Sequence, residues 1–147
     1  MVADLTGTDA TPSPLRVRLA ISGLVACVVV ILGITMWPQP VDRGLEGTVA
    51  RVLEVLHELG APKWFGYAHL EFSANVLMFV PLGFFITLLL ARRRRWIAFV
   101  LPPLMSAAIE LTQLLLLSAR FATLSDVVAN SVGGWIGALI ALLIVRK

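Results

Sequence analysis

Four long apolar runs restrict what this sequence can fold into. A helix of about 20 apolar residues, rising 1.5 Å per residue, crosses the ~30 Å hydrocarbon core of a bilayer. The runs that are long enough cover approximately Leu19–Trp37, Phe72–Ala91, Trp96–Ser118 and Val127–Val145. Because 59% of the 147 residues are hydrophobic and only 14% are charged, a soluble domain of this size would have too little interior for them. The sequence therefore predicts an all-α fold, a polytopic membrane bundle of four transmembrane helices.

The chain divides into a short lead and one membrane domain. Residues 1–15 are polar and contain Pro12 and Pro14, which predicts a disordered cytoplasmic N-terminus. Residues 16–147 form the single predicted membrane domain. Cys27 is the only cysteine, so it has no internal disulfide partner and no neighbouring metal ligands at the usual spacing. We expect neither a cofactor nor a metal.

The loop after the first run carries a helical pattern. Between Asp42 and Gly60, apolar residues recur at helical spacing, and charged residues and His57 occupy the positions between them; the apolar residues are Leu45, Val49, Val52, Leu53, Leu56 and Leu59. This pattern predicts an amphipathic helix in the first outer loop, lying at the membrane interface.

The basic residues indicate how the chain is oriented. If all four runs span, one side of the membrane receives Arg16, Arg18, Arg92–Arg95, Arg146 and Lys147. The other side receives Arg43, Arg51, Lys63 and Arg120. The positive-inside rule then places both termini in the cytoplasm of a multi-pass plasma-membrane protein. The formal net charge of +3 follows from this topology and does not indicate nucleic-acid binding.

Two acidic residues, Glu110 and Asp126, lie inside segments that are otherwise apolar enough to span a bilayer. A charge at the centre of a membrane helix costs roughly 2.5–3.5 kcal/mol on insertion scales, so such residues are functional candidates. Helical spacing places further polar side chains on the same helix faces as these acids. Other polar residues lie at the outer ends of the runs and in the last outer turn. The predicted binding residues are His69, Asn75, Glu110, Gln113, Arg120, Asp126 and Asn130.

These residues converge near the outer surface, whereas the inner half of each run has almost no polar group. A path across the whole membrane would need polar residues there as well. The distribution therefore favours a shallow pocket that is open to the outer face. Two interpretations remain open: a site that binds or acts on an amphipathic molecule, and a polar network that only fixes the packing of the helices.

The polar residues also form three ordered motifs that resemble the VanZ-like family of small bacterial integral membrane proteins. The motifs are His69-Leu70-x-x-x-x-Asn75-x-x-x-Phe79-x-Pro81-x-Gly83, Ser106-x-x-x-Glu110-x-x-Gln113, and Arg120 with Asp126, Asn130, Gly133 and Gly137. The resemblance covers about residues 66–145. One departure is Thr123, which stands where the family often has an acid.

The resemblance implies an integral membrane protein of the bacterial cell envelope. The family's namesake is associated with resistance to the glycopeptide teicoplanin, but most members have no established activity. Our leading hypothesis is a binding protein for a lipid headgroup, a lipid-linked envelope precursor or a lipophilic glycopeptide-type antibiotic. The alternatives are an intramembrane enzyme with Glu110 and Asp126 as an acid–base pair, and an accessory subunit that packs against a partner membrane protein.

Overall fold

The structure is a computed structural model that describes residues 13–37, 44–117 and 123–145. The elements are α1 (Pro14–Thr35), α2 (Glu46–Glu58), α3 (Tyr67–Leu89), the short 3-10 helix η1 (Arg92–Arg94), α4 (Ile97–Leu116) and α5 (Leu124–Val145). Four of these helices, α1, α3, α4 and α5, are long and apolar enough to cross a membrane. The predicted all-helical bundle with four membrane-spanning helices is therefore confirmed.

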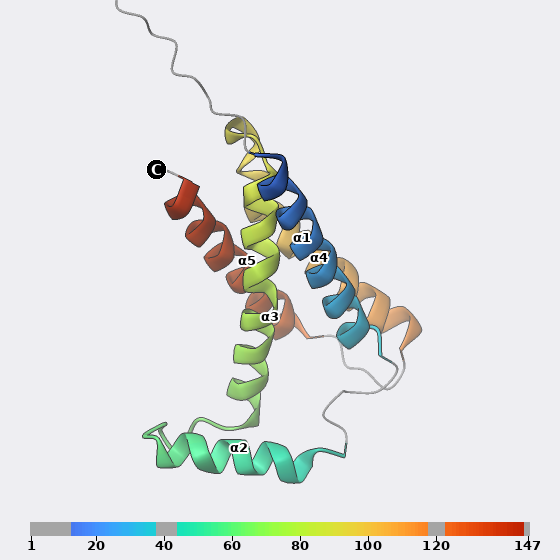
Figure 1. The fold of residues 1–147 in the computed structure, drawn as a ribbon. Helices are drawn as coiled ribbons and strands as arrows, with labels where there is room; N and C mark the ends of the chain where they lie inside the picture. Colours follow the sequence, from blue (N-terminus) through green and yellow to red (C-terminus); the bar gives the residue numbers. More distant parts are fainter. Residues whose placement is uncertain (1–12, 38–43, 118–122, 146–147) are drawn as a thin grey trace, which may run out of the picture.

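The four long helices alternate in direction, so the bundle has two distinct ends (Figure 1). One end gathers the start of α1, η1 and the end of α5. We call it the arginine end, because it carries Arg16, Arg18 and Arg92–Arg95. At the opposite end lie the ends of α1 and α4 and the start of α5, and the start of α3 extends beyond them to α2. We call it the acidic end, because all carboxylates of the described residues lie there or in the adjoining half of the bundle: Glu46, Glu54, Glu58, Glu71, Glu110 and Asp126.

Local capping explains why α1 begins earlier than the apolar run predicted. The Ser13 side chain accepts a hydrogen bond from the N–H of Arg16 at 3.4 Å, and Pro14 occupies the first turn. Both features start helices, because they satisfy or remove N–H groups that have no partner in the helix. Pro14 and Leu15, which we had expected in the N-terminal lead, therefore belong to α1. Residues 1–12 lie outside the described residues.

A seam of glycines brings α3 and α5 into backbone contact. We define the glycine seam as Gly83 of α3 with Gly133, Gly134 and Gly137 of α5. A methyl group at Gly83 would overlap the carbonyl oxygen of Gly134, and one at Gly137 would overlap that of Val80. Small residues permit this close approach, which supplies the dispersion contact that holds membrane helices together. The pair α3–α5 is the most extensive helix contact in the described chain.

Consecutive prolines of α4 fit against the same part of α5. A methyl group at Gly134 would overlap the ring of Pro102, so only glycine leaves room for this ring. Pro103 has no N–H and so leaves the carbonyl of Phe99, four residues earlier, without its helical donor. The indole N–H of Trp135 donates to that carbonyl at 2.7 Å. A side chain of α5 thus replaces the backbone donor that α4 lacks.

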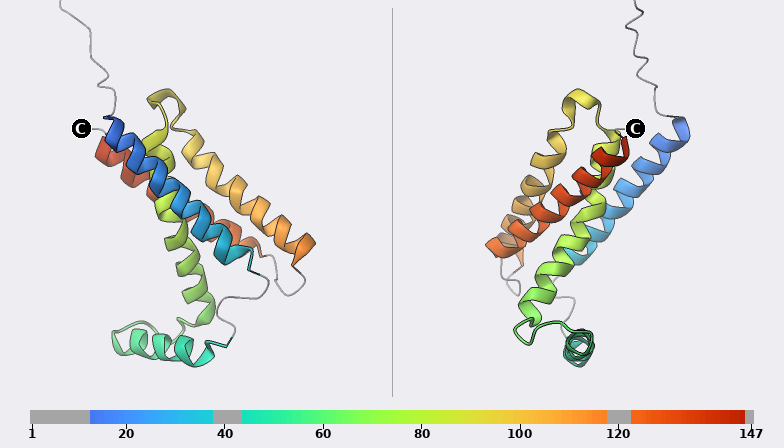
Figure 2. Two further views of the ribbon diagram at one scale, coloured as in Figure 1. Left: turned by 45° about the vertical axis from the view of Figure 1, so that its right-hand side comes forward. Right: turned by 90° about the vertical axis from the view of Figure 1, so that its left-hand side faces the viewer.

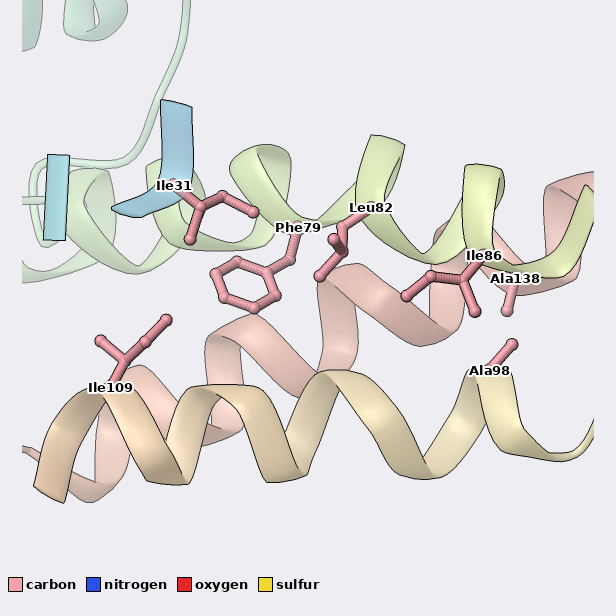
Figure 3. Close-up of a cluster of buried hydrophobic side chains, with 7 residues drawn as sticks. All are labelled: Ile31, Phe79, Leu82, Ile86, Ala98, Ile109 and Ala138. Carbon is pink, nitrogen blue, oxygen red and sulfur yellow. The ribbon is translucent and has the colours of Figure 1, made fainter. Parts of the chain in front are cut away.

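The apolar core lies between the four spanning helices. Figure 3 shows Ile31 of α1 and Phe79, Leu82 and Ile86 of α3 facing side chains of α4 and α5, which are Ala98, Ile109 and Ala138. The helices contribute unequally. Of the most apolar 18-residue window in each helix, 44% is buried in α5 but only 11% in α1. Hence α1 is the peripheral helix of the bundle.

Helix α2 lies across the acidic end, beside the start of α3 and beyond the other spanning helices (Figure 2). It lies between Gly44 and Gly60, whose φ angles of 86° and 102° suit glycine. Leu53 and Leu56 are half-buried, whereas the apolar side chains Leu45, Val52, Val55 and Leu59 are exposed. The predicted amphipathic segment is therefore helical, and its position in a membrane interface stays a prediction.

Candidate functional site

Three helices contribute to a hydrogen-bonded cluster at the acidic end. Asn75 of α3 donates through Nδ2 to Oδ1 of Asp126 at 2.7 Å, and the Thr123 hydroxyl donates to Oδ2 of the same carboxylate at 2.8 Å. The backbone N–H of Thr123 donates to Oε2 of Glu110, on α4, at 2.8 Å. Thr123 therefore bridges the two acids, and the cluster connects α3, α4 and α5.

Asp126 lies in the first turn of α5, at the very start of its candidate membrane span. Its own N–H donates to Oγ1 of Thr123 at 3.1 Å, so Thr123 caps the helix, and Asp126 belongs to the first turn. A carboxylate is favourable there, because the first turn is the positive end of the helix dipole. We expected α5 to begin near Val127, and the cap shifts its start to Leu124. The insertion cost of Asp126 is thereby lower than a mid-membrane position would impose.

Glu110 is the acid that lies within a span. It is six residues before the end of α4, or about 9 Å along a helix that rises 1.5 Å per residue, and its side chain is buried with 9% exposure. Asp126 is half-buried. The two carboxylates therefore share a bridging residue but have different access to their surroundings.

A second pair of polar residues lies one turn, or about 6 Å, deeper in the bundle. Asn130 of α5 donates through Nδ2 to the hydroxyl oxygen of Ser106 on α4 at 2.8 Å. Ser106 is 0% and Asn130 2% exposed. The other amide atom, Oδ1 of Asn130, is buried and has no hydrogen-bond partner. A buried acceptor without a donor costs about 1–3 kcal/mol, so this atom marks a site where the protein has an unused acceptor.

Gln113 forms a contact of a different kind. Its Nε2 donates to the backbone carbonyl of Thr35 at 2.8 Å, at the end of α1. The last carbonyls of a helix have no intrahelical donor, and Gln113 supplies one from α4. Its side chain is buried at 5% exposure. This contact joins the peripheral helix α1 to the bundle.

His69 lies outside this hydrogen-bonded cluster. Nδ1 of His69 accepts from the N–H of Gly66 at 3.2 Å, and its ring lies against Trp64 and Phe65 with centroid distances of 5.1 and 5.4 Å. His69 therefore caps the start of α3, as the third helical residue does in a capping box. Arg120 lies outside the described residues.

Sequence reasoning missed Thr123 and Thr35. The spacing Thr123-x-x-Asp126 is a capping signal that would have placed the start of α5. Nothing in the sequence indicates that the carbonyl of Thr35 would receive Gln113, because that pairing joins residues that are far apart in the chain.

The cluster offers mainly acceptor atoms. Two carboxylates and the free Oδ1 of Asn130 can accept hydrogen bonds from hydroxyl, amide or ammonium groups. Within residues 13–37, 44–117 and 123–145, no three His, Cys, Asp or Glu side chains group as a metal site would require. The arrangement therefore suits recognition of a polar group at the end of an apolar bundle.

The fold and this polar cluster define a class, the small polytopic helical membrane proteins with acidic residues in or beside their spans. Within that class, the sequence model of the VanZ/LLP1 family matches residues 23–145. The match covers most of the 147 residues, and the chain belongs to this family. Comparisons with curated proteins and with solved structures each returned no significant match.

Proposed function

We propose that this membrane protein binds the polar part of an amphipathic molecule at its acidic end. The observation that carries the proposal is the buried Oδ1 of Asn130, which has no hydrogen-bond partner. A network that served only to pack helices would be closed, because every unpaired polar atom lowers stability. An acceptor without a donor, one turn below two carboxylates, is explained by a ligand that supplies the donor.

The chemistry of the cluster restricts the ligand to molecules with hydrogen-bond donors and an apolar part. A lipid headgroup, a lipid-linked envelope precursor and a lipophilic glycopeptide-type antibiotic all meet this requirement. In this proposal His69 and Glu71 lie at the mouth of the site, and Asn75 and Gln113 hold in place the helices that line it. Arg120 binds an anionic group of the ligand. If the ligand is a glycopeptide, its capture at the membrane would contribute to resistance.

The proposal includes an orientation in the bacterial plasma membrane. Because all described arginines except Arg51 of α2 gather at one end, that end and both termini face the cytoplasm in this proposal, and the acidic end faces the outer leaflet. Cysteine labelling in a Cys27→Ser background tests this. A membrane-impermeant reagent added from outside should label a cysteine at position 56 and not one at position 94. The reverse pattern would contradict the orientation.

Mass spectrometry of co-purified lipids tests the binding function. We compare the wild type with Glu110→Gln, which keeps an acceptor for the Thr123 N–H but removes ionisation, and with Asn130→Leu, which removes the free acceptor. Ser131→Ala is the matched control, because the Ser131 hydroxyl donates to the Val127 carbonyl of its own helix at 2.6 Å. Both site variants should lose the bound molecule, and the control should keep it.

Folding must be separated from binding in this experiment. Thermal unfolding in detergent should show Glu110→Gln at least as stable as the wild type, because the amide removes the cost of a buried charge. Unchanged lipid content and glycopeptide susceptibility in both site variants would refute the binding function and leave a packing network.

An acid–base enzyme is the second candidate, and one observation favours it. Glu110 is buried, Asp126 is half-buried, and Thr123 contacts both. Two carboxylates in unlike environments can take opposite roles in proton transfer. Chemical conversion of a lipid-linked substrate by the wild type, and its absence in Asp126→Asn, would support this candidate over simple binding.

A further inference from the structure

The arginine end contains one arginine that differs from its neighbours. Arg92, Arg93 and Arg94 form η1, and their side chains are exposed. Arg95 is half-buried, and its Nε is a buried atom without a hydrogen-bond partner. A buried donor on a charged group is costly unless an acceptor completes it. The described residues therefore supply no acceptor for the Nε of Arg95.

The described part of the chain offers no anionic side chain at this end. Its carboxylates all lie at the acidic end or in the half of the bundle next to it: Glu46, Glu54, Glu58, Glu71, Glu110 and Asp126. The arginine end carries Arg16, Arg18 and the run Arg92–Arg95. Figure 2 shows η1 and the start of α1 as separate segments at this end.

The chain order gives the depth of Arg95 in the membrane. Trp96 follows it with 63% exposure, and the apolar helix α4 begins at Ile97. Exposed tryptophans at the end of a spanning helix lie at the headgroup level. One turn further along α4, Val100 and Leu101 are 43% and 42% exposed. A phosphate can thus reach Arg95 while an acyl chain of the same molecule lies along α4.

We propose that Arg95 and the exposed arginines of η1 bind the phosphate of an anionic lipid in the leaflet at the arginine end. The guanidinium group presents its N–H donors in a fixed fork that matches a phosphate, and the Nε donor of Arg95 has no hydrogen-bond partner within the part of the protein that the structure describes. The site is separate from the proposed ligand site at the acidic end. Neither proposal requires the other.

A phosphatidylglycerol titration tests the site. The full chain is held in micelles of an uncharged, phosphate-free alkyl maltoside detergent, and its thermal unfolding temperature is followed as phosphatidylglycerol is added. A ligand that binds the folded state raises this temperature and yields an apparent dissociation constant. Arg95→Gln should weaken binding at least tenfold, whereas Arg93→Gln, which removes the same charge from an exposed position, should weaken it about fivefold.

High salt distinguishes a structured binding site from nonspecific electrostatic attraction. At about 1 M salt the Debye length is about 3 Å, so the exposed Arg93 should no longer contribute, and Arg93→Gln should bind like the wild type. Arg95→Gln should remain at least tenfold weaker. Arg95→Lys keeps the charge but loses the fork and should also remain weaker. Equal affinities of all variants at high salt would overturn the site.

The source of the phosphate is tested in parallel. Inorganic phosphate and glycerol 3-phosphate are added to the same micelles in place of the lipid. Little or no rise in unfolding temperature with these soluble phosphates supports the assignment to a lipid. A rise equal to that with phosphatidylglycerol would overturn it in favour of a soluble phosphate ligand.

Discussion

The glycine seam and the acidic end both join α3 to α5, but with opposite chemistry. Along the seam, Gly83 and Gly137 bring backbone atoms of the two helices into contact. At the acidic end, a hydrogen bond of 2.7 Å between Asn75 and Asp126 joins the same helices. In a lipid environment, close dispersion contact and interhelical hydrogen bonds are the two available means of association.

The two regions differ in whether they leave a polar atom without a hydrogen-bond partner. The seam is closed, because a single added methyl group would overlap a backbone atom of the facing helix. The polar region next to the acidic end leaves a buried acceptor, Oδ1 of Asn130, without a partner. The seam is therefore filled by the protein's own atoms, whereas the acidic end is where we propose that a ligand binds.

The largest effect on stability should come from overpacking the glycine seam. Gly137→Ala adds a methyl group that overlaps the carbonyl of Val80, so α3 and α5 must separate. We expect a loss of about 2–3 kcal/mol in the free energy of unfolding, typical of an overpacked contact. Gly33→Ala on α1 is the control, because nothing lies within 4 Å of the added methyl. It should stabilise by about 0.5–1 kcal/mol, as measured by reversible unfolding in detergent.

The next effect concerns the hydrogen bond at the acidic end. Asn75→Leu removes the donor to Asp126 Oδ1, and an unpaired, partly buried acceptor costs about 1–3 kcal/mol. Ser73→Ala is the control on the same helix, because the Ser73 hydroxyl donates only locally, to the His69 carbonyl at 2.7 Å. Equal unfolding free energies for the two variants would mean that the acidic end does not hold α3 against α5.

A smaller effect tests the contact beside the seam. Trp135→Phe removes the indole donor and leaves the Phe99 carbonyl without a partner, at a cost of about 0.5–1.5 kcal/mol. In a Pro103→Ala background, the restored backbone N–H should supply that carbonyl instead. A double-mutant cycle should then show that the cost of Trp135→Phe falls. An unchanged cost would show that the indole stabilises through packing alone.

The smallest effect on stability should be found on α2. Spin labels at Val52 and Leu59 replace exposed apolar side chains, and we expect less than about 0.5 kcal/mol of change. The labels should nevertheless be shielded from a water-soluble relaxation agent, and labels at Glu54 and Glu58 should be accessible to it. Equal accessibility at all four positions would show that α2 does not lie in the membrane interface.

Much of the fold was predictable, because a bilayer permits few alternatives. Apolar run length alone predicted four spanning helices, and the spacing of Gly133 and Gly137 indicated a close helix contact, which the structure places against α3. The helix starts were less predictable. They depend on caps such as Ser13 and Thr123, whose side chains act over three residues and leave no trace in hydropathy.

The candidate site was predicted in its residues but not in its connections. Helical spacing placed Glu110 and Asp126 near the same end, and the structure joins them through Thr123. That bridge depends on a backbone N–H, which every residue except proline carries, so no residue type could have revealed it. The capping role of His69 was missed as well. It arises because α3 begins at Tyr67, before the predicted run at Phe72, and it too depends on a backbone N–H, that of Gly66.

The peripheral position of α1 has a consequence for how the protein is made. α1 has the highest hydropathy of the four spanning helices, 2.5 against 1.6 for α4, and its few polar groups include Thr35, whose hydroxyl bonds to its own helix. It can enter the bilayer alone as soon as it is synthesised. α4 carries Glu110 and Gln113, whose partners include the later Thr123 and the earlier Thr35. We therefore expect that α4 becomes stable in the membrane only after α5 has been synthesised. The two helices would then insert as a hairpin and pack against α1 and α3, which are already in the membrane.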